Sequence, residues 1–410
     1  HYGVNTDLMI SGAACTLGYT PEILGPHFLA SYEDTPVDGV RRGGFQVLVG
    51  GPAYGSGSSR EVAVTAHQGA GIQLVIAESL QRIFQENLVF AGMPFTTDLR
   101  VLDRLRAGEG ISIRSLSRDL PPFFRAVADH GGLLPYATAL LENRTPLPYR
   151  TDRPSGPMTV AEKLLAQNAV RGAGEGVGVS RVTPGEQVFV QAGFLGLHEY
   201  TAGMVMSLYR EAFGAAPLAE TTHVACFEDH FTLLDRPSVP EALKARRLEP
   251  ARRLTEEMHE VAERYALPLH GPGRTHDAGV CHRIVVERYA EPGMIVALTD
   301  SHTPTAGVLN AFAYGVGSTA MAFALRTGWL PATVPLTVRV NVRGRAHSVL
   351  SPKDLILHVI GDPYFREEQW RRTPSDTCVL EWAGEGLEGW TVDELSVLTN
   401  MTVEGGLMTG

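Results

Sequence analysis

A strand, a glycine-rich turn, a helix and a second strand follow one another between residues 45 and 77, and this order constrains the fold most. Residues 45–50 and 72–77 are short apolar runs containing β-branched residues, and 61–68 between them has helical composition. Strands joined through a helix usually pair in parallel. The N-terminal part of the chain is therefore expected to contain a βαβ unit of an α/β fold.

The chain has 410 residues, enough for two to four domains. The clearest boundary is 143–157, where four prolines and three arginines stand among few large apolar residues, a composition typical of a stiff, solvated linker. The sequence that follows, from Thr159 to Glu162, has the spacing of a capping box and predicts the start of a helix. A second domain is expected to begin there.

The region after the linker is also expected to be α/β. The composition predicts helices over 202–213, 253–265 and 306–325, strands over 294–298 and 336–342, and a turn and helix near 352–357. The run 306–325 carries no charge, but its glycines, Asn310, Ser318 and Thr319 make it a poor membrane span and a good buried helix.

Charge and cysteine content limit the partners. Thirty-five basic against 45 acidic residues give a net charge of −10, so no global field attracts nucleic acid or an anionic membrane. An anionic ligand must be held by local arginines, and small molecules are the expected partners. The cysteines lack paired spacing, which favours a reducing compartment, and we expect the cytoplasm. They are Cys15, Cys226, Cys281 and Cys378.

The segment 55–61, Gly-Ser-Gly-Ser-Ser-Arg-Glu, joins the first predicted strand to its helix. Free amides at a helix start bind anions, and Ser58, Ser59 and Arg60 add two hydroxyls and a guanidinium that suit a carboxylate. Arg60 stands where a dinucleotide-binding loop needs a third glycine, and Ser59 breaks the spacing of a nucleophile elbow. Taken alone, the pattern is more typical of a helix cap with a solvated arginine.

Acidic residues and histidines recur together after the linker. An aspartate that accepts a hydrogen bond from an imidazole fixes the histidine tautomer and forms an acid–base pair, although a buried histidine satisfied in this way is more often structural. A zinc site is the rival interpretation, but 198–202 lacks the second histidine of an HExxH motif. The residues concerned are His198, Glu199, Asp229, His230, His282, Asp300 and His302.

Together these segments resemble the aconitase superfamily, the iron–sulfur hydro-lyases that include aconitase, homoaconitase and isopropylmalate isomerase. The glycine-rich segment is similar to a loop of the family's mobile swivel domain, and later stretches match, in order, motifs of its first large domain. An N-M-x-x-E pattern is similar to the start of the family's next domain. The matching stretches are 55–61, 300–307, 315–319 and 351–357, with Asn400 and Glu404 in the last pattern.

The resemblance implies an aconitase-like α/β fold: a swivel domain, similar to the family's separate small subunit, at 1–142, a linker at 143–157, a first large domain at 158–390 and the start of a further domain at 391–410. An anion-binding helix end that faces a cluster of carboxylates and imidazoles would supply both the base and the acid that elimination of water needs.

The resemblance further implies roles for single residues. Ser58 would be the base that removes the proton α to a carboxylate, and Ser59 and Arg60 would bind and polarise the substrate. Asp229 with His230, and Asp300 with His302, would form acid pairs that handle the departing hydroxyl. The other residues implied are His282 at the hydroxyl or water, His198, Glu199 and Ser301 at the substrate, and Asn400 and Glu404 beside a [4Fe–4S] cluster.

The chain departs from the family's pattern in several places. The family's three cluster-binding cysteines lie in a later G-S-C-T-N segment and a C-x-x-C, and neither occurs here. A cluster would therefore need a second chain or a missing segment. Val62 stands where the family has a small residue or a histidine after the Arg-Glu pair. The segment 11–20 lacks the family's substrate-specificity motif. The swivel-like part is also N-terminal, whereas the family usually has it last or as a separate subunit.

We expect a hydro-lyase or isomerase acting on a hydroxylated di- or tricarboxylate, alkylmalate- or citrate-like, with a [4Fe–4S] cluster needed for full activity. Two alternatives stay open. One is a cluster-free or mononuclear-metal hydratase using His230, His282 and His302. The other is a fragment or pseudo-enzyme that binds carboxylates or a partner subunit.

Overall fold

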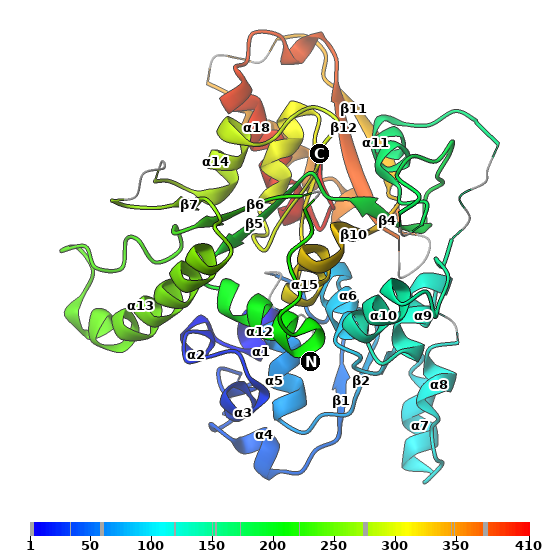
Figure 1. Ribbon diagram of the computed structural model, residues 1–410, viewed down its shortest axis with the longest axis vertical. Helices are drawn as coiled ribbons and strands as arrows, with labels where there is room; N and C mark the ends of the chain where they lie inside the picture. Colours follow the sequence, from blue (N-terminus) through cyan, green and yellow to red (C-terminus); the bar gives the residue numbers. More distant parts are fainter. Residues whose placement is uncertain are drawn as a thin grey trace.

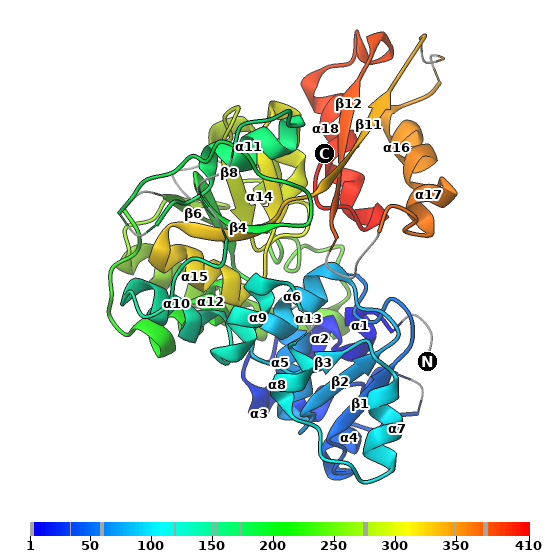
Figure 2. The same ribbon diagram turned by 90° about the vertical axis from the view of Figure 1, so that its right-hand side faces the viewer.

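The computed structural model describes residues 4–410 except 33, 58–60, 119, 150, 152–153, 173, 221, 274–277, 346, 348 and 372–375. The described residues form an α/β fold with four sheets, as expected. Three bodies of structure are visible in Figure 2: the N-terminal body in blue, a central body in green and yellow, and a C-terminal body in orange and red.

The N-terminal body is built on a parallel sheet of β1 (Val47–Gly50), β2 (Leu74–Ala77) and β3 (Phe95–Thr96), in that order. Helix α5 (Val62–Gly69) connects β1 to β2, so the predicted βαβ unit is confirmed. The other helices of this body are α1 (Thr6–Met9), α2 (Gly12–Cys15), α3 (Pro21–Leu24), α4 (Gly39–Arg42), α6 (Arg82–Phe90), α7 (Arg100–Arg106), α8 (Ile113–Leu116), α9 (Pro122–Asp129) and α10 (Leu133–Leu141).

The central body contains a five-stranded parallel sheet in the order β7-β6-β5-β8-β9. Its strands are almost fully buried, because helices cover both faces (Figure 1). The strands are β5 (Phe194–His198), β6 (His223–Phe227), β7 (Leu269–His270), β8 (Ile295–Leu298) and β9 (Phe312–Gly315); β4 (Gln187–Gln191) and β10 (Trp329–Thr333) form an antiparallel pair beside them. The helices are α11 (Val160–Asn168), α12 (Ala202–Phe213), α13 (Glu241–Arg264), α14 (Cys281–Arg288), the 3₁₀ segment η2 (Thr303–Leu309) and α15 (Ser318–Thr327).

The C-terminal body has its own core around the parallel pair β11 (Leu336–Asn341) and β12 (Cys378–Ala383). Leu380 of β12 and Leu398 of α18 (Val392–Asn400) share that core, so residues on both sides of the expected boundary at 390 pack together. The domain boundaries of the family remain a prediction. The body is completed by α16 (Pro352–Ile360), α17 (Pro363–Arg366), η3 (Glu385–Leu387) and η4 (Met401–Gly405).

The single helix predicted over 306–325 is wrong. Segment η2, strand β9 and helix α15 follow one another there. The run lacks charge because β9 is buried on both faces of a parallel sheet, and a short apolar run of this kind cannot be told from a buried helix by periodicity. Gly315 is the last residue of the strand, and Gly317 is the N-cap residue of the helix. The helix predicted at 202–213 is confirmed, and the one at 253–265 is the second half of α13.

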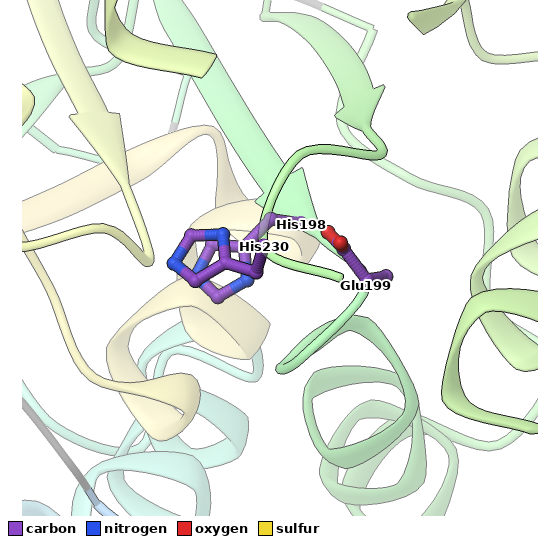
Figure 3. Close-up of side chains that lie close together, drawn as sticks. All are labelled: His198, Glu199 and His230. Carbon is purple, nitrogen blue, oxygen red and sulfur yellow. The ribbon is translucent and has the colours of Figure 1, made fainter. Parts of the chain in front are cut away.

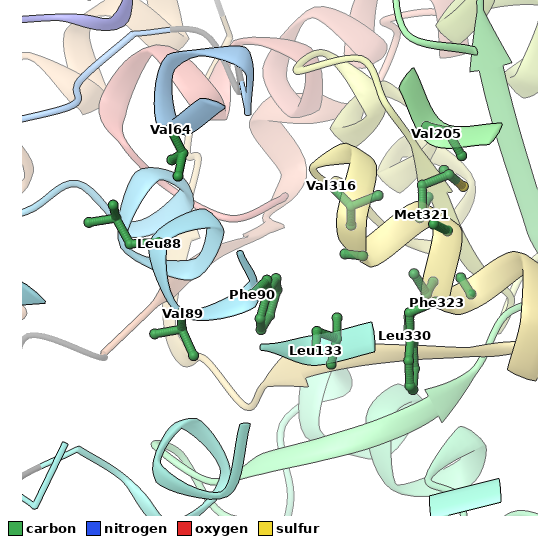
Figure 4. Packing of buried hydrophobic residues seen from close by; sticks show 14 of the residues in the cluster. Val64, Leu88, Val89, Phe90, Leu133, Val205, Val316, Met321, Phe323 and Leu330 are labelled. Carbon is green, nitrogen blue, oxygen red and sulfur yellow. The ribbon is translucent and has the colours of Figure 1, made fainter. Parts of the chain in front are cut away.

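One hydrophobic core joins the N-terminal and central bodies. Figure 4 shows Phe90 of α6 and Leu133 of α10 beside Phe323 of α15. Helix α10 packs against both α12 and α15. Because this core is continuous, the segment after β1 is held against the carboxyl edge of the five-stranded sheet. None of the helices in the described ranges combines the length and apolar character needed to cross a membrane.

The capping box predicted at the start of α11 is confirmed, and its loss should be measurable. Glu162 N donates to Thr159 Oγ1 at 3.4 Å, and Thr159 N donates to Glu162 Oε2 at 2.8 Å. Thr159→Ala is expected to lower the free energy of unfolding by about 1 kcal/mol, as for other N-caps. Chemical denaturation measures the change. Thr159→Ser keeps the hydroxyl and should lose little; equal losses in both variants would contradict a capping role.

Candidate active site

The polar residues singled out in the sequence meet at one edge of the five-stranded sheet. His198 is the last residue of β5, Asp229 follows β6 and Asp300 follows β8. These strands are parallel neighbours, so their carboxyl ends lie side by side, where open α/β sheets usually bind ligands. Glu199 follows the end of β5, and helix α12 starts only at Ala202.

A cavity of about 320 Å³ opens at this edge, between the central body and the N-terminal body. Residues of both bodies line it. The central body contributes His198, Tyr200, Thr201, Met204, His230, Phe231, Arg247, Thr299, Asp300, Ser301, Val316 and Ser318, and the N-terminal body contributes Gly12, Thr16, Glu61 and Val62.

Asp229 and His230 form a hydrogen-bonded pair at the cavity. His230 Nδ1 lies 2.5 Å from Asp229 Oδ1. Burial lowers the pKa of His230, but the hydrogen bond to Asp229 and the nearby carboxylates outweigh it and raise the pKa to about 9. Burial raises the pKa of Asp229, yet its bond to His230 brings the pKa below the usual value. His230 is therefore protonated at neutral pH, the state that a general acid needs.

Asp300 pairs with His282 rather than with His302, which corrects the expected pairing. His282 Nδ1 lies 2.7 Å from Asp300 Oδ2, whereas His302 gives Asp300 only its backbone N–H, at 3.2 Å from Oδ1. Burial raises the pKa of Asp300, but the bond to His282 and the surrounding histidines hold it below the usual range. His302 has another acid partner: its Nε2 is 3.3 Å from Glu404 Oε1.

Cys281 connects the two aspartates, a role that the sequence did not reveal. Its backbone N–H donates to Asp229 Oδ2 at 2.6 Å, and its thiol donates to Asp300 Oδ2 at 3.3 Å. Burial and both carboxylates raise the pKa of the thiol well above the usual value, so the sulfur stays protonated and can donate. The isolated cysteine had no spacing signal; only its position before His282 could have drawn attention to it.

Glu199 and His198 support the Asp229–His230 pair. Glu199 accepts hydrogen bonds from the backbone N–H groups of Asp229 and Phe231, at 3.2 and 2.7 Å. The rings of His198 and His230 stack with centroids 3.9 Å apart (Figure 3). Burial and the neighbouring His230 lower the pKa of His198 to about 3, and burial raises that of Glu199 to about 7. His198 is therefore neutral beside a charged His230.

Potential metal ligands also gather here, in two groups whose donor atoms lie within 4.8 Å of one another. The first group is His198, Glu199 and His230. The two imidazole rings are stacked, so the lone pairs in their planes do not point at one common ion, and the Glu199 oxygens already accept backbone hydrogen bonds. In the group Cys281, His282 and Asp300, the thiol and the imidazole both approach one carboxylate oxygen.

A second cavity of about 490 Å³ adjoins the first, with Ser301 in both linings. Gly55, Ser56 and Gly57 line it on one side, and His302 and Glu404 on the other. The glycine-rich segment thus lies opposite the His302–Glu404 pair. Asn400 is turned elsewhere, since its side-chain amide donates to Thr305 Oγ1 at 2.8 Å. Ser58, Ser59 and Arg60 lie outside the described residues, and their roles remain predictions.

Arg247 is a lining residue that the sequence analysis missed. It comes from α13, well away from every motif, and contributes a guanidinium to the cavity. A short arginine-rich stretch on an exposed helix gives no signal that one of its members lines a cavity. Its charge suits an anionic ligand.

The cysteines of the chain do not fit an iron–sulfur cluster. All four are buried, and they lie in different elements: Cys15 in α2, Cys226 in β6, Cys281 in α14 and Cys378 in β12. Burial raises the pKa of Cys226 and of Cys378 to about 12, so both sulfurs are protonated thiols in this structure. Among the residues that the structure describes, no two cysteines share a potential metal-binding group.

Two family models match the chain. The model described as the aconitase family (aconitate hydratase) matches residues 171–410, and that of the aconitase C-terminal domain matches 39–96. The first covers more than half of the chain. The chain belongs to the aconitase family. The second match lies before the first along the chain.

The chain is similar to the large subunits of 3-isopropylmalate dehydratases. The 3-isopropylmalate dehydratase large subunit 1 of Pyrococcus furiosus is 31% identical over 62% of this chain and 53% of its own length. The large subunit 2 of Methanopyrus kandleri is 34% identical over 60% and 54%. The chain thus spans about half the length of these relatives. A crystal structure of 3-isopropylmalate dehydratase (leuD) from Methanocaldococcus jannaschii aligns with 35% of this chain and 92% of its own, at 25% identity and a TM-score of 0.27.

Proposed function

We propose that this chain forms part of a hydro-lyase or isomerase that removes water from a hydroxylated carboxylate and adds it back. The observation that supports this most is the convergence of three acid–histidine pairs on two adjoining cavities that the glycine-rich segment borders. The pairs are Asp229–His230, Asp300–His282 and Glu404–His302. Family membership and the dehydratase names of the relatives favour the same reaction class.

The two sides of the site suit the two halves of a dehydration. One C–H bond is broken on the carbon next to a carboxylate, and a base, proposed to be Ser58 as its alkoxide, takes that proton and becomes a hydroxyl. The C–O bond on the adjacent carbon is broken, and His230, charged at neutral pH, gives its proton to the departing hydroxyl. Water and an alkene result. Rehydration reverses these transfers, and addition in the opposite orientation gives the isomer.

The lining of the first cavity favours an alkyl-substituted acid such as an alkylmalate. Val62, Met204, Phe231 and Val316 supply apolar surface next to the polar residues. An alkyl group placed there leaves water, which is worth roughly 0.8 kcal/mol per CH₂. The names of the relatives, 3-isopropylmalate dehydratase large subunits, agree with such a substrate.

Arg247 is proposed to bind a substrate carboxylate. Arg247→Gln is expected to raise KM about 10- to 100-fold with a smaller change in kcat, because a charge-assisted hydrogen bond contributes roughly 1.5–3 kcal/mol. Steady-state kinetics measures both constants. Arg246→Gln, the exposed neighbour on the same helix, is the matched control. Equal increases of KM in both variants would show that Arg247 acts only through the overall charge of the protein and does not bind the carboxylate.

If the enzyme uses a [4Fe–4S] cluster, we propose that the cysteines that bind it lie outside these 410 residues, in a further segment or a second chain. The relatives' name, large subunit, is consistent with another chain in those enzymes. Iron and acid-labile sulfide should therefore be absent from the purified 410-residue chain and present in the complete enzyme. Stoichiometric iron and sulfide in the chain alone would contradict this assignment.

A direct assay tests the reaction class. The complete enzyme, reconstituted anaerobically, is incubated with 2-isopropylmalate, 3-isopropylmalate or citrate, and the conjugated alkene acid is followed by its ultraviolet absorbance. Deuterium from solvent should enter the carbon next to the carboxylate. Binding of these acids without alkene formation or deuterium exchange would contradict a hydro-lyase and favour a carboxylate-binding protein.

A mononuclear-metal hydratase is a second candidate, supported by the closeness of the ligand atoms of Cys281, His282 and Asp300. The set expected from the sequence was His230, His282 and His302, and only His282 belongs to both sets. His302 instead pairs with Glu404. Metal analysis of the active enzyme separates the candidates: one zinc or iron per chain without sulfide favours this one, and dependence on Cys281 would locate the ion.

A further inference from the structure

Glu61 connects the glycine-rich segment to the central body. It is the last residue of 55–61 and only 5% exposed. Thr319 N donates to Glu61 Oε2 at 2.7 Å, and the Thr319 hydroxyl donates to Glu61 Oε1. Burial raises the pKa of Glu61, and the Thr319 hydrogen bonds and the backbone N–H of Ser318 oppose that rise. The two Thr319–Glu61 bonds join residues 258 positions apart in the sequence, across the two bodies.

The carboxylate of Glu61 is a suitable acceptor for the N–H groups at the start of α15. The N-cap residue of α15 is Gly317, which has no side chain to cap the helix. The first N–H groups of a helix need acceptors, and the helix dipole favours a negative charge there. Glu61 supplies both from the other body. A buried carboxylate is costly without such partners, so the contact is specific rather than incidental.

The backbone at Gly317 leaves room for this contact. A Cβ on Gly317 would lie 2.6 Å from Glu61 Oε2 and would also overlap the side chain of Asn87 in α6. Both neighbours belong to the N-terminal body. Glycine therefore lets that body approach the first turn of α15 closely, and a larger residue would push it away.

The contact also lies between two cavities. Glu61 and Met204 line the 320 Å³ cavity of the candidate active site, and they line a larger cleft of about 570 Å³ between the N-terminal and central bodies. Thr319 lines that cleft, and Ser318 lines the cavity. The Glu61–α15 contact thus forms part of the wall that separates the proposed reaction site from the cleft.

We propose that Glu61 is a positioning residue, whose carboxylate caps α15 from the N-terminal body and so holds the glycine-rich segment at the reaction site. The residues just before it in sequence are those proposed to remove the proton and bind the substrate. A small movement of this segment displaces a base from its proton, and misplacement of about 1 Å can cost about 10²-fold in rate. This inference rests on the proposed function.

The test combines Glu61→Gln and Thr319→Val, singly and together, in the complete enzyme. Glutamine keeps the size of Glu61 but loses the charge, and its NH₂ group competes with the donors of α15. Valine keeps the shape and the backbone N–H of Thr319 but removes the hydroxyl. We expect kcat to fall about 10- to 100-fold in Glu61→Gln with KM within about threefold, because the acid–histidine pairs and Arg247 are unchanged. The double variant should fall by less than the product of the single effects.

A second readout needs no substrate and stands if the proposed reaction is wrong. Hydrogen exchange at the amides of Ser318 and Thr319 should be about 10- to 100-fold faster in Glu61→Gln, as expected when a charge-assisted hydrogen bond is lost. Thr319→Val, a milder change, covers the case in which Glu61→Gln does not fold. Unchanged exchange would overturn the proposed contact, and additive losses in kcat or a pure rise in KM would overturn the positioning role.

Discussion

Asp300→Asn is expected to lower kcat about 10³- to 10⁴-fold, the largest effect of any single substitution considered, within the range of lost acid–base function. Asp300 accepts hydrogen bonds from the His282 ring, the Cys281 thiol and the His302 backbone. Asparagine keeps the shape but removes the negative charge that accepts these hydrogen bonds, and its NH₂ group faces donors. Single-turnover formation of the alkene by the complete enzyme measures the loss.

The control for Asp300→Asn separates catalysis from folding. Asp235→Asn changes an exposed aspartate that pairs with Arg252 and lies outside the site, and it should leave kcat near the wild-type value. The thermal midpoint of both variants shows whether the site is still formed. A folded Asp300→Asn enzyme with kcat within about tenfold of wild type would contradict the role given to the Asp300–His282 pair.

Local chemistry explains what could be predicted from the sequence. The βαβ unit and the capping box at Thr159 depend on residues a few positions apart, and both are present. Asp229 and His230 are neighbours in sequence and pair in the structure. Such features need no knowledge of how distant strands are ordered, so a single sequence contains enough information for them.

The contacts that could not be predicted from the sequence are those that depend on the order of the strands in the sheet. Asp300 stands two residues from His302, yet it pairs with His282, because α14 presents that ring beside the end of β8. His302 is then free to meet Glu404, 102 residues later. Cys281, Arg247 and Glu61 acquire their roles from elements that meet only in the folded chain. Strand β9 was mistaken for helix because burial on both faces removes the alternation that marks a strand.

Asp229→Asn is expected to lower the pH at which activity is lost on the basic side. In the wild type, burial lowers the pKa of His230, but the Asp229 hydrogen bond and charge raise it to about 9, above the ordinary value of 6.5. His230 is therefore protonated below pH 9 and loses its proton as the pH rises through 9. Without the Asp229 charge the burial effect remains, so the pKa should fall toward the ordinary value, while the charges of Glu199 and Asp300 still oppose burial.

The consequence is a large loss of activity in mildly alkaline solution. At pH near 8, His230 would be protonated in the wild type and largely neutral in Asp229→Asn, so kcat should fall about 10²-fold, including the lost orientation of the ring. At acidic pH the difference should shrink. The profile of kcat/KM from about pH 6 to pH 10 measures the shift, since it reports groups of the free enzyme.

The pH dependence of the free energy of unfolding gives an independent check on the direction of the His230 pKa shift. Because the pKa of His230 is raised in the folded state, its protonation stabilises the fold fully below the unfolded value near 6.5, and that stabilisation disappears as the pH rises through 9. The free energy of unfolding of the wild type should therefore exceed that of Asp229→Asn most at acidic to neutral pH, and the gap should narrow above pH 9. Asp235→Asn should show neither change. A basic limb at the same pH in wild type and Asp229→Asn would remove His230 as the acid.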